Sequence, residues 1–138
     1  MAPLKQKGDV AELAVALDLR RRGYQVAIPF GEDCMYDLVV DRGDRLERVQ
    51  VKHSTSDGEV ITVRCRSVSV TNGKVVQSHR YTAADIDWLA VYDPTTDRCY
   101  YIPAAFLGNG RSIINLRLVP ARSGRRQGIN WAEDFLQL

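Results

Sequence analysis

Residues 36–52 read YDLVVDRGDRLERVQVK, and their pattern gives the clearest indication of the fold. Residues 36–40 form a short run rich in β-favouring side chains, and residues 46–52 alternate between polar and apolar side chains. The turn residues 42–44, Arg-Gly-Asp, are few enough to join two antiparallel strands. We therefore expect a β-hairpin over residues 36–52.

The alternation places a set of polar side chains on one surface of this hairpin. Gln50 and Lys52 share one strand face, while Val49 and Val51 point to the other. Asp37, near the start of the first strand, can face the polar pair across the hairpin. Phosphodiester cleavage needs a cation, a carboxylate that holds it and an amine near the attacking water. We therefore predict that Asp37, Gln50 and Lys52 form the centre of an active site.

A divalent cation is the cofactor that these residue types favour. Mg²⁺ prefers oxygen ligands and keeps several waters, so the Asp37 carboxylate, the Gln50 amide oxygen and the Val51 backbone carbonyl form a sufficient set. Glu12 lies on the first predicted helix, from which it could lean over the end of the hairpin as a further ligand; the alternative is a surface helix residue. Lys52 would orient or help deprotonate the nucleophilic water. We expect Mg²⁺, with Mn²⁺ as a substitute.

Upstream of the hairpin the sequence predicts an amphipathic helix that ends near Gly23. Arg20-Arg21-Arg22 in its last turn suit the negative end of the helix dipole, which favours a capping role over a ligand role. Apolar residues recur at the spacing of one helix face, and we expect them to form its apolar stripe: Val10, Leu13, Ala14 and Leu17.

Further strands are predicted on both sides of the hairpin. They span residues 24–28, 60–66, 88–92, 98–102 and 112–118, with a turn at Asn72-Gly73, a helical turn at 82–85 and a short helix over 131–136. Strand 88–92 reads as central and buried, so its aromatic residues and those of strand 98–102 are expected in the core rather than stacked on bases. No repeat or linker divides the chain. We expect an α/β fold with a mixed sheet of about five or six strands flanked by helices, in one domain over residues 1–138.

Composition bounds the class of protein. The chain has 138 residues, of which 45% are hydrophobic and 26% charged, as in ordinary globular domains. Its longest apolar runs are much shorter than the roughly 20 residues of a membrane span, and the first residues lack the apolar core of a secretory signal, so a cytoplasmic location is the default expectation. Three widely separated cysteines, Cys34, Cys65 and Cys99, lack zinc-ligand spacing and are expected to be reduced and buried.

The net charge of +2 is too small to indicate nucleic-acid binding by itself, but the charges are unevenly distributed. Acids gather in residues 32–47 and 85–97, whereas every charged side chain in residues 111–126 is an arginine. His53 and His79 lack the neighbours of a general base. Candidate contacts to a DNA backbone are Lys7, Ser54, Arg64, Arg66, Lys74 and Arg80. For the basic residues plain solvent exposure remains an alternative, and for Ser54 so does a turn before Asp57-Gly58.

The order of these residues is similar to a known family. Glu12, then Tyr36-Asp37, then Gln50-Val51-Lys52 resembles the PD-(D/E)XK nuclease superfamily, which includes restriction enzymes, junction-resolving enzymes and some intron-encoded homing endonucleases. The match is best with homing endonuclease-like proteins in which Gln replaces the second acid. It extends from Lys7 to about Phe135 and includes Lys7-Gly8, Ala11-Glu12, Tyr36-Asp37-Leu38, Val49-Gln50-Val51-Lys52, Asp85-Ile86-Asp87 and Tyr100-Tyr101-Ile102-Pro103.

This resemblance implies a restriction endonuclease-like core and a Mg²⁺-dependent DNA endonuclease. It implies that Asp37 and Gln50 are metal ligands, that Glu12 is an auxiliary acid and that Lys52 is the catalytic amine. Two departures are Tyr36 in the position of the proline and Gln50 in the position of the second acid. Cutting both strands would favour a homodimer or homotetramer.

Three alternatives stay open. One is a resolvase-like cutter of branched or Holliday-type DNA. Another is a DNA-binding module that keeps the nuclease fold and has lost turnover, a reading that Gln50 supports because it removes a negative charge. The third is a surface hairpin with ordinary polar residues.

Overall fold

The computed structural model describes residues 3–31, 33–71, 74–124 and 127–138, with backbone alone for residues 69–71 and 74–77. A five-stranded sheet in the order β1-β2-β3-β7-β8 lies at its centre. Its only parallel pair is β3 with β7, so the sheet is mixed, as predicted. The strands are β1 (Gln25–Ala27), β2 (Leu38–Asp41), β3 (Leu46–His53), β7 (Trp88–Asp93) and β8 (Arg98–Pro103).

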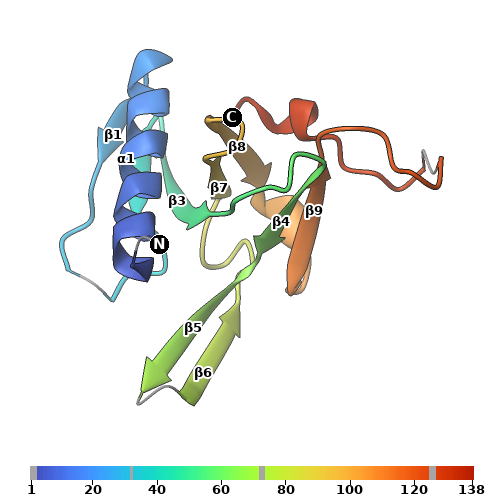
Figure 1. Cartoon of the computed structure of the whole chain (residues 1–138). Coiled ribbons are helices and arrows are strands. Elements are labelled where there is room, and N and C mark those ends of the chain that lie inside the picture. The colour runs from blue at the N-terminus through green and yellow to red at the C-terminus, as the bar shows by residue number, and fades with distance from the viewer. Residues whose placement is uncertain (1–2, 32, 72–73, 125–126) are drawn as a thin grey trace.

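The predicted hairpin is the β2–β3 pair. Its antiparallel register places Leu38 opposite Val49 and Asp41 opposite Leu46. Helix α1 (Leu4–Arg21) lies alongside this part of the sheet, and Gly23 after it takes a positive φ of +90°, which suits a glycine at a helix end (Figure 1).

The helix packs on a different face from the predicted one. Ala11, Val15 and Leu19 are buried against β-strand residues of the core, while the predicted stripe faces outward: Val10 is 42% exposed, Leu13 71% and Leu17 50%, with Ala14 half-buried. Two apolar rows run along this helix at i, i+4 spacing, and periodicity does not rank them. The packed row is the one whose small Ala11 and branched Val15 fit against the sheet, and it turns the adjacent Glu12 toward the hairpin.

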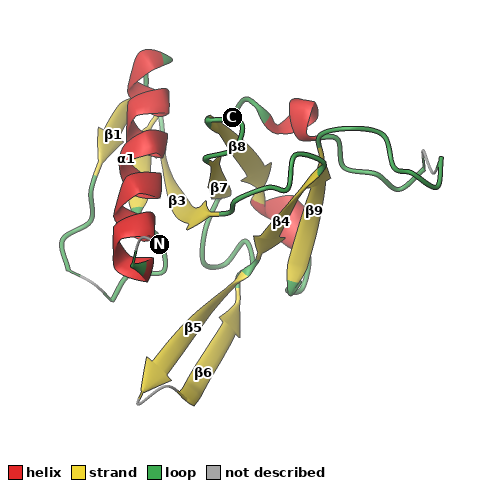
Figure 2. Cartoon of the chain, viewed as in Figure 1, coloured by secondary structure: helices red, strands yellow, loops and turns green. Residues whose placement is uncertain are grey.

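The other face of the sheet is covered mainly by strands and two short 3₁₀ helices rather than by long helices (Figure 2). Strand β4 (Val60–Arg64) pairs with β9 (Ile113–Arg117), and the 3₁₀ helices are Ala104–Leu107 and Ala132–Phe135. The second of these fulfils the prediction of a short helix near the chain end. Tyr100 and Tyr101 are buried in the core and Trp88 and Tyr92 are half-buried; Cys65 and Cys99 are buried as expected, whereas Cys34 is intermediate.

The strand predicted over residues 60–66 is two strands. At Cys65 the backbone N–H donates to Ser112 O at 2.9 Å, and the Cys65 carbonyl accepts from Tyr81 N at 3.0 Å. The chain therefore changes partners at this residue, from β9 to β6, and β5 (Arg66–Thr71) begins after it. Strands β5 and β6 (Lys74–Arg80) form a hairpin that projects from the rest of the molecule (Figure 1). The predicted turn at Asn72-Gly73 lies outside the described residues.

In the part of the chain that the structure describes, no helix is both long enough and apolar enough to span a membrane.

Candidate active site

The candidate site forms where β2 begins beside the middle of β3. Asp37 directly precedes β2, and its backbone N–H donates to Val49 O at 2.9 Å, which extends the hairpin register by one step. Asp37 Oδ2 accepts the Val51 N–H at 3.0 Å, and Gln50 Oε1 accepts the same N–H at 3.0 Å. The carboxylate and the amide oxygen therefore meet at one backbone group, as the hairpin predicted.

The Val51 backbone adds an oxygen to this edge. In an extended strand the N–H and C=O of one residue point to the same side, so the Val51 carbonyl lies on the side to which its N–H faces Asp37. Strand β2 begins only at Leu38, so the regular β2–β3 ladder ends before Val51. The Val51 carbonyl thus lies beyond the last paired residue of β2, on the side of Asp37.

Glu12 reaches this position from helix α1. The pKa of its carboxyl group is raised from 4.5 to about 7, first by burial and then by the negative charge of Asp37 and a hydrogen bond with it. Two acids that share one partly buried space repel each other when both are ionised, and a cation between them relieves that repulsion. A surface hollow between α1 and the residues before β2 opens at the same point and is lined by Asp9, Glu12, Leu13, Ala16, Ile28, Asp37 and Leu38.

Lys52 completes the predicted set on the same strand face as Gln50. Its Nζ donates to Arg66 O at 3.0 Å and lies 5.3 Å from the centroid of the Tyr81 ring. Burial lowers the pKa of the Lys52 amine, an effect that the nearby charge of Asp37 partly opposes. An amine with a lowered pKa exchanges protons more readily near neutral pH than an exposed lysine does.

Tyr81 is a member of the site that sequence reasoning missed. Gln50 Nε2 donates to Tyr81 Oη at 2.5 Å, and the tyrosine is 1% exposed. The residue follows β6, 31 positions after Gln50, and no local motif marks it. Only the path of the chain through the β5–β6 hairpin returns it to β3.

The donor set fits a hard divalent cation. It consists of two carboxylates, an amide oxygen and a backbone carbonyl, all oxygen ligands of the kind that Mg²⁺ and Mn²⁺ accept. Within the described residues no three His, Cys, Asp or Glu side chains gather into a metal-binding group.

The candidate DNA contacts fall into two groups. Arg64, Arg66 and Arg80 are exposed, and Arg66 lies opposite Arg80 at the base of the β5–β6 hairpin. Arg64 and Arg66 were predicted on one strand; they lie at the end of β4 and the start of β5, on either side of Cys65, because the chain changes partners there. Lys74 is in β6, and its side chain lies outside the described residues.

Lys7 and Ser54 belong to other elements: Lys7 is in helix α1, and Ser54 directly follows β3. Burial lowers the pKa of His53, which ends β3, and the positive charge of Lys7 lowers it further. Ser54 is half-buried, and its N–H donates to Tyr92 O at 3.0 Å.

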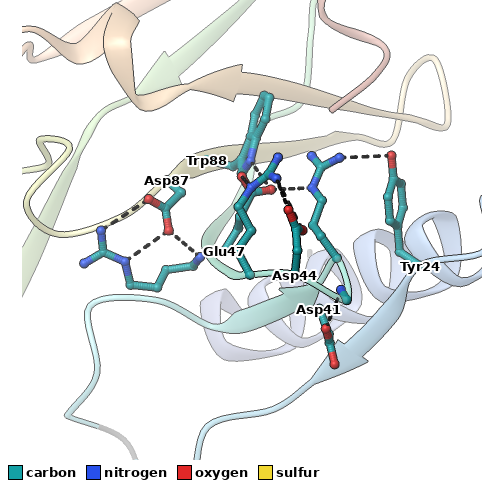
Figure 3. Close-up of polar contacts among 10 residues, drawn as sticks. Tyr24, Asp41, Asp44, Glu47, Asp87 and Trp88 are labelled. Atoms are coloured by element: carbon teal, nitrogen blue, oxygen red, sulfur yellow. Dashed lines mark hydrogen bonds and ion pairs between the residues drawn. The ribbon is translucent and has the colours of Figure 1, made fainter.

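A second polar cluster occupies the turn end of the same hairpin (Figure 3). Asp87 Oδ2 accepts from the Arg48 backbone N at 2.7 Å and from Arg48 Nε at 3.2 Å. Glu47 Oε1 accepts from Arg42 Nε at 2.6 Å and from Trp88 Nε1 at 3.1 Å. Hydrogen bonds from these donors lower the pKa values of Asp87 and Glu47 against the opposing effect of burial. Opposite charges are matched here, so this cluster supports the fold.

Comparisons with known proteins assign the sequence to a protein family and find solved structures that are similar to this fold. A family model described as PD-(D/E)XK endonuclease matches residues 3–138. A bacterial homing endonuclease, I-Ssp6803I, superposes with a TM-score of 0.76 at 25% identity, covering 97% of this chain and 88% of that one. Hjc, a Holliday junction resolvase of Archaeoglobus fulgidus, gives a TM-score of 0.49 at 14% identity over 93% of this chain and 94% of that one. No curated protein is significantly similar in sequence.

Proposed function

Because the chain belongs to the PD-(D/E)XK endonuclease family, we propose that it hydrolyses phosphodiester bonds in DNA with the help of Mg²⁺, for which Mn²⁺ can substitute. The cation would be held by Asp37, Glu12, the Gln50 amide oxygen and the Val51 carbonyl. The observation that carries this proposal is the convergence of Asp37 and Gln50 on the Val51 N–H, with a hydrogen bond between Glu12 and Asp37 beside it.

Each side chain has a distinct task in this proposal. A bound cation would neutralise the negative charge that develops on the phosphate during attack by water. Asp37 and Glu12 supply the negative charge that attracts the cation. The negative charge of Asp37 acts on the Lys52 amine, whose pKa burial lowers. A lowered pKa suits an amine that orients the attacking water and exchanges a proton with it.

The substrate class follows from the family and from the surface around the site. The family and the homing endonuclease neighbour support DNA as the substrate. The exposed arginines at the base of the β5–β6 hairpin, Arg66 and Arg80, lie next to the site, because Lys52 Nζ contacts the Arg66 carbonyl. These arginines, with Arg64, would contact the phosphates of DNA whose scissile bond lies at Asp37.

The part of the chain that the structure describes carries one such site, so cutting both strands of a duplex would need two copies. We propose a homodimer or a homotetramer, in which symmetry relates the sites. If the spacing of the two sites fits a four-way junction better than a linear duplex, junctions will compete for the protein far more strongly than duplex does. That result would select the branched-DNA cutter over the sequence-specific cutter.

The test is cleavage of supercoiled plasmid and of a synthetic four-way junction in Mg²⁺, in Mn²⁺ and in EDTA. We expect metal-dependent cutting that Lys52→Ala reduces by about a thousandfold, as for the loss of a group that moves protons in a transition state. Arg48→Ala is the matched control, because it removes a cation of the same strand outside the site. Salt-sensitive DNA binding by the wild type with no cutting in either metal would instead establish a silent DNA-binding module.

A further inference from the structure

An amide ligand raises a problem that a carboxylate does not. The two oxygens of a carboxylate are equivalent, so either can face a cation. The side chain of Gln50 has one oxygen and one NH₂ group of nearly the same shape, and only the oxygen can be a ligand. A site that uses glutamine in this position therefore needs something that keeps the oxygen turned inward.

The Gln50 amide has a partner at each of its two ends. Its Oε1 accepts the Val51 N–H at 3.0 Å, on the side of Asp37. Its Nε2 donates to Tyr81 Oη at 2.5 Å, on the opposite side. Reversing the amide would place its NH₂ group against the Val51 N–H, donor against donor, so these two contacts favour the same orientation.

Tyr81 is well suited to hold this contact. Its side chain is 1% exposed, and its backbone N–H is fixed to Cys65 O at 3.0 Å, where the chain passes from β4 into β5. Besides the Gln50 amide, the Ser67 side chain also forms a hydrogen bond with the Tyr81 hydroxyl group. The same ring lies under the Lys52 amine, with 5.3 Å between Nζ and the ring centroid. One buried side chain thus touches two members of the site.

We propose that Tyr81 is a positioning residue that anchors the Gln50 amide nitrogen and thereby turns the amide oxygen toward the cation. The proposal rests on the proposed function of the site. Without the hydroxyl group the half-buried amide nitrogen loses its acceptor, and the amide turns away to find another partner. The oxygen then no longer points steadily at the ligand position beside Asp37.

The test compares Tyr81→Phe in two backgrounds, the wild type and Gln50→Glu, by calorimetric titration of the folded protein with Mn²⁺. The phenylalanine keeps the ring and the packing and removes only the hydroxyl group. In the wild-type background we expect Mn²⁺ affinity to fall by about fivefold, the loss of one hydrogen bond. In the Gln50→Glu background we expect a change of less than about twofold, because either carboxylate oxygen can then serve.

Tyr100→Phe is the matched control. Tyr100 is 2% exposed, and its hydroxyl group contacts Thr96 Oγ1 at 3.0 Å rather than a residue of the site. Loss of its hydroxyl should leave Mn²⁺ affinity within about twofold of the wild type, although it removes a hydrogen bond of the same kind. An equal loss from Tyr81→Phe in both backgrounds, or a loss equal to that of Tyr100→Phe, would overturn the proposal.

A second measurement needs neither metal nor cleavage. The side-chain NH₂ signals of Gln50 in ¹⁵N-labelled, metal-free protein should shift in Tyr81→Phe and stay in place in Tyr100→Phe. Unchanged Gln50 signals in Tyr81→Phe would contradict the proposal even if the wild type binds Mn²⁺ and cuts DNA. If the Gln50 signals shift in Tyr81→Phe but the wild type binds no Mn²⁺, the contact would be upheld and the function that we propose for the site would be overturned.

Discussion

The two ends of the β2–β3 hairpin carry polar clusters whose acidic side chains have different neighbours. At the turn end each acid faces a cation or an N–H donor: Glu47 pairs with Arg42, and Asp87 pairs with Arg48 (Figure 3). At the other end Asp37 also accepts a backbone N–H, that of Val51, but Glu12 faces a second acid, Asp37 itself. The pKa values differ accordingly: those of Glu47 and Asp87 are lowered, whereas that of Glu12 is raised to about 7.

The difference separates a cluster that stabilises the fold from the cluster that we propose as the active site. Matched charges stabilise a fold without any ligand, whereas two neighbouring acids weaken it until a cation binds. Both clusters use residues of the family motifs, since the Asp85-Ile86-Asp87 segment contributes to the turn end. A motif residue is therefore not automatically a residue of the active site.

The largest expected effect comes from exchanging one acid of the proposed active site for its amide. Asp37→Asn keeps an oxygen near the Val51 N–H but removes the charge that attracts the cation, so cleavage should fall by about a thousandfold. The rate of plasmid nicking in Mg²⁺ measures this loss. Thermal unfolding in EDTA should show no loss of stability; a large drop in the midpoint would move Asp37 to a structural role.

The same exchange at the turn end should have the opposite outcome. Asp87→Asn weakens the hydrogen bonds with Arg48, and we expect the free energy of unfolding to fall by about 1–2 kcal/mol. Urea denaturation measures the change. Cleavage well below the unfolding midpoint should equal that of the wild type, and a tenfold slower rate would show that this cluster also shapes the active site.

Removing the repulsion between the two acids should stabilise the metal-free protein. Glu12→Gln should raise the free energy of unfolding in EDTA at pH 8 by on the order of 1 kcal/mol, since the carboxylate is only partly buried. Cleavage should be impaired in the same variant. Glu133→Gln, which changes an exposed glutamate, is the control and should leave stability unchanged.

The two clusters should change the stability of the protein with pH in opposite directions. The Glu12 pKa is raised in the folded state, so the folded protein holds that proton more tightly and stability in EDTA should decline as the pH rises from about 4.5 to about 7. The Asp87 pKa is lowered, so its contribution is present above its ordinary value of 3.8 and is lost as the pH falls below that value. Glu12→Gln should abolish the first decline only, and a wild-type profile that rises from pH 4.5 to 7 would refute the assignment.

The smallest effects compare two arginines near the turn. The side chain of Arg42 is 18% exposed and that of Arg45 is 56% exposed, although both pair with Glu47. Arg42→Ala should lower the unfolding midpoint measurably, whereas Arg45→Ala should leave it unchanged, because exposed ion pairs contribute little. Equal shifts in the two variants would mean that the cluster acts as one network of charges.

The sequence predicted the hairpin and most of the strands because alternation and turn residues are local signals. It placed Gln50 and Lys52 on one face of β3 for the same reason, and Asp37 beside them through the short turn. The prediction of which face of α1 packs was wrong, because two apolar rows run along the helix and periodicity does not distinguish them. The division of the 60–66 strand at Cys65 was also missed, since it depends on which strand each half meets.

The amino-acid sequence alone gives the order of the site residues, and the period of two along a strand places Gln50 and Lys52 on one face of β3. Long-range packing set which distant groups complete the site. Helix rotation brought Glu12 to Asp37, and the path through the β5–β6 hairpin brought the Tyr81 hydroxyl to Gln50 and the Arg66 carbonyl to Lys52. These contacts join residues far apart in the chain, and long-range packing rather than local periodicity sets their distances.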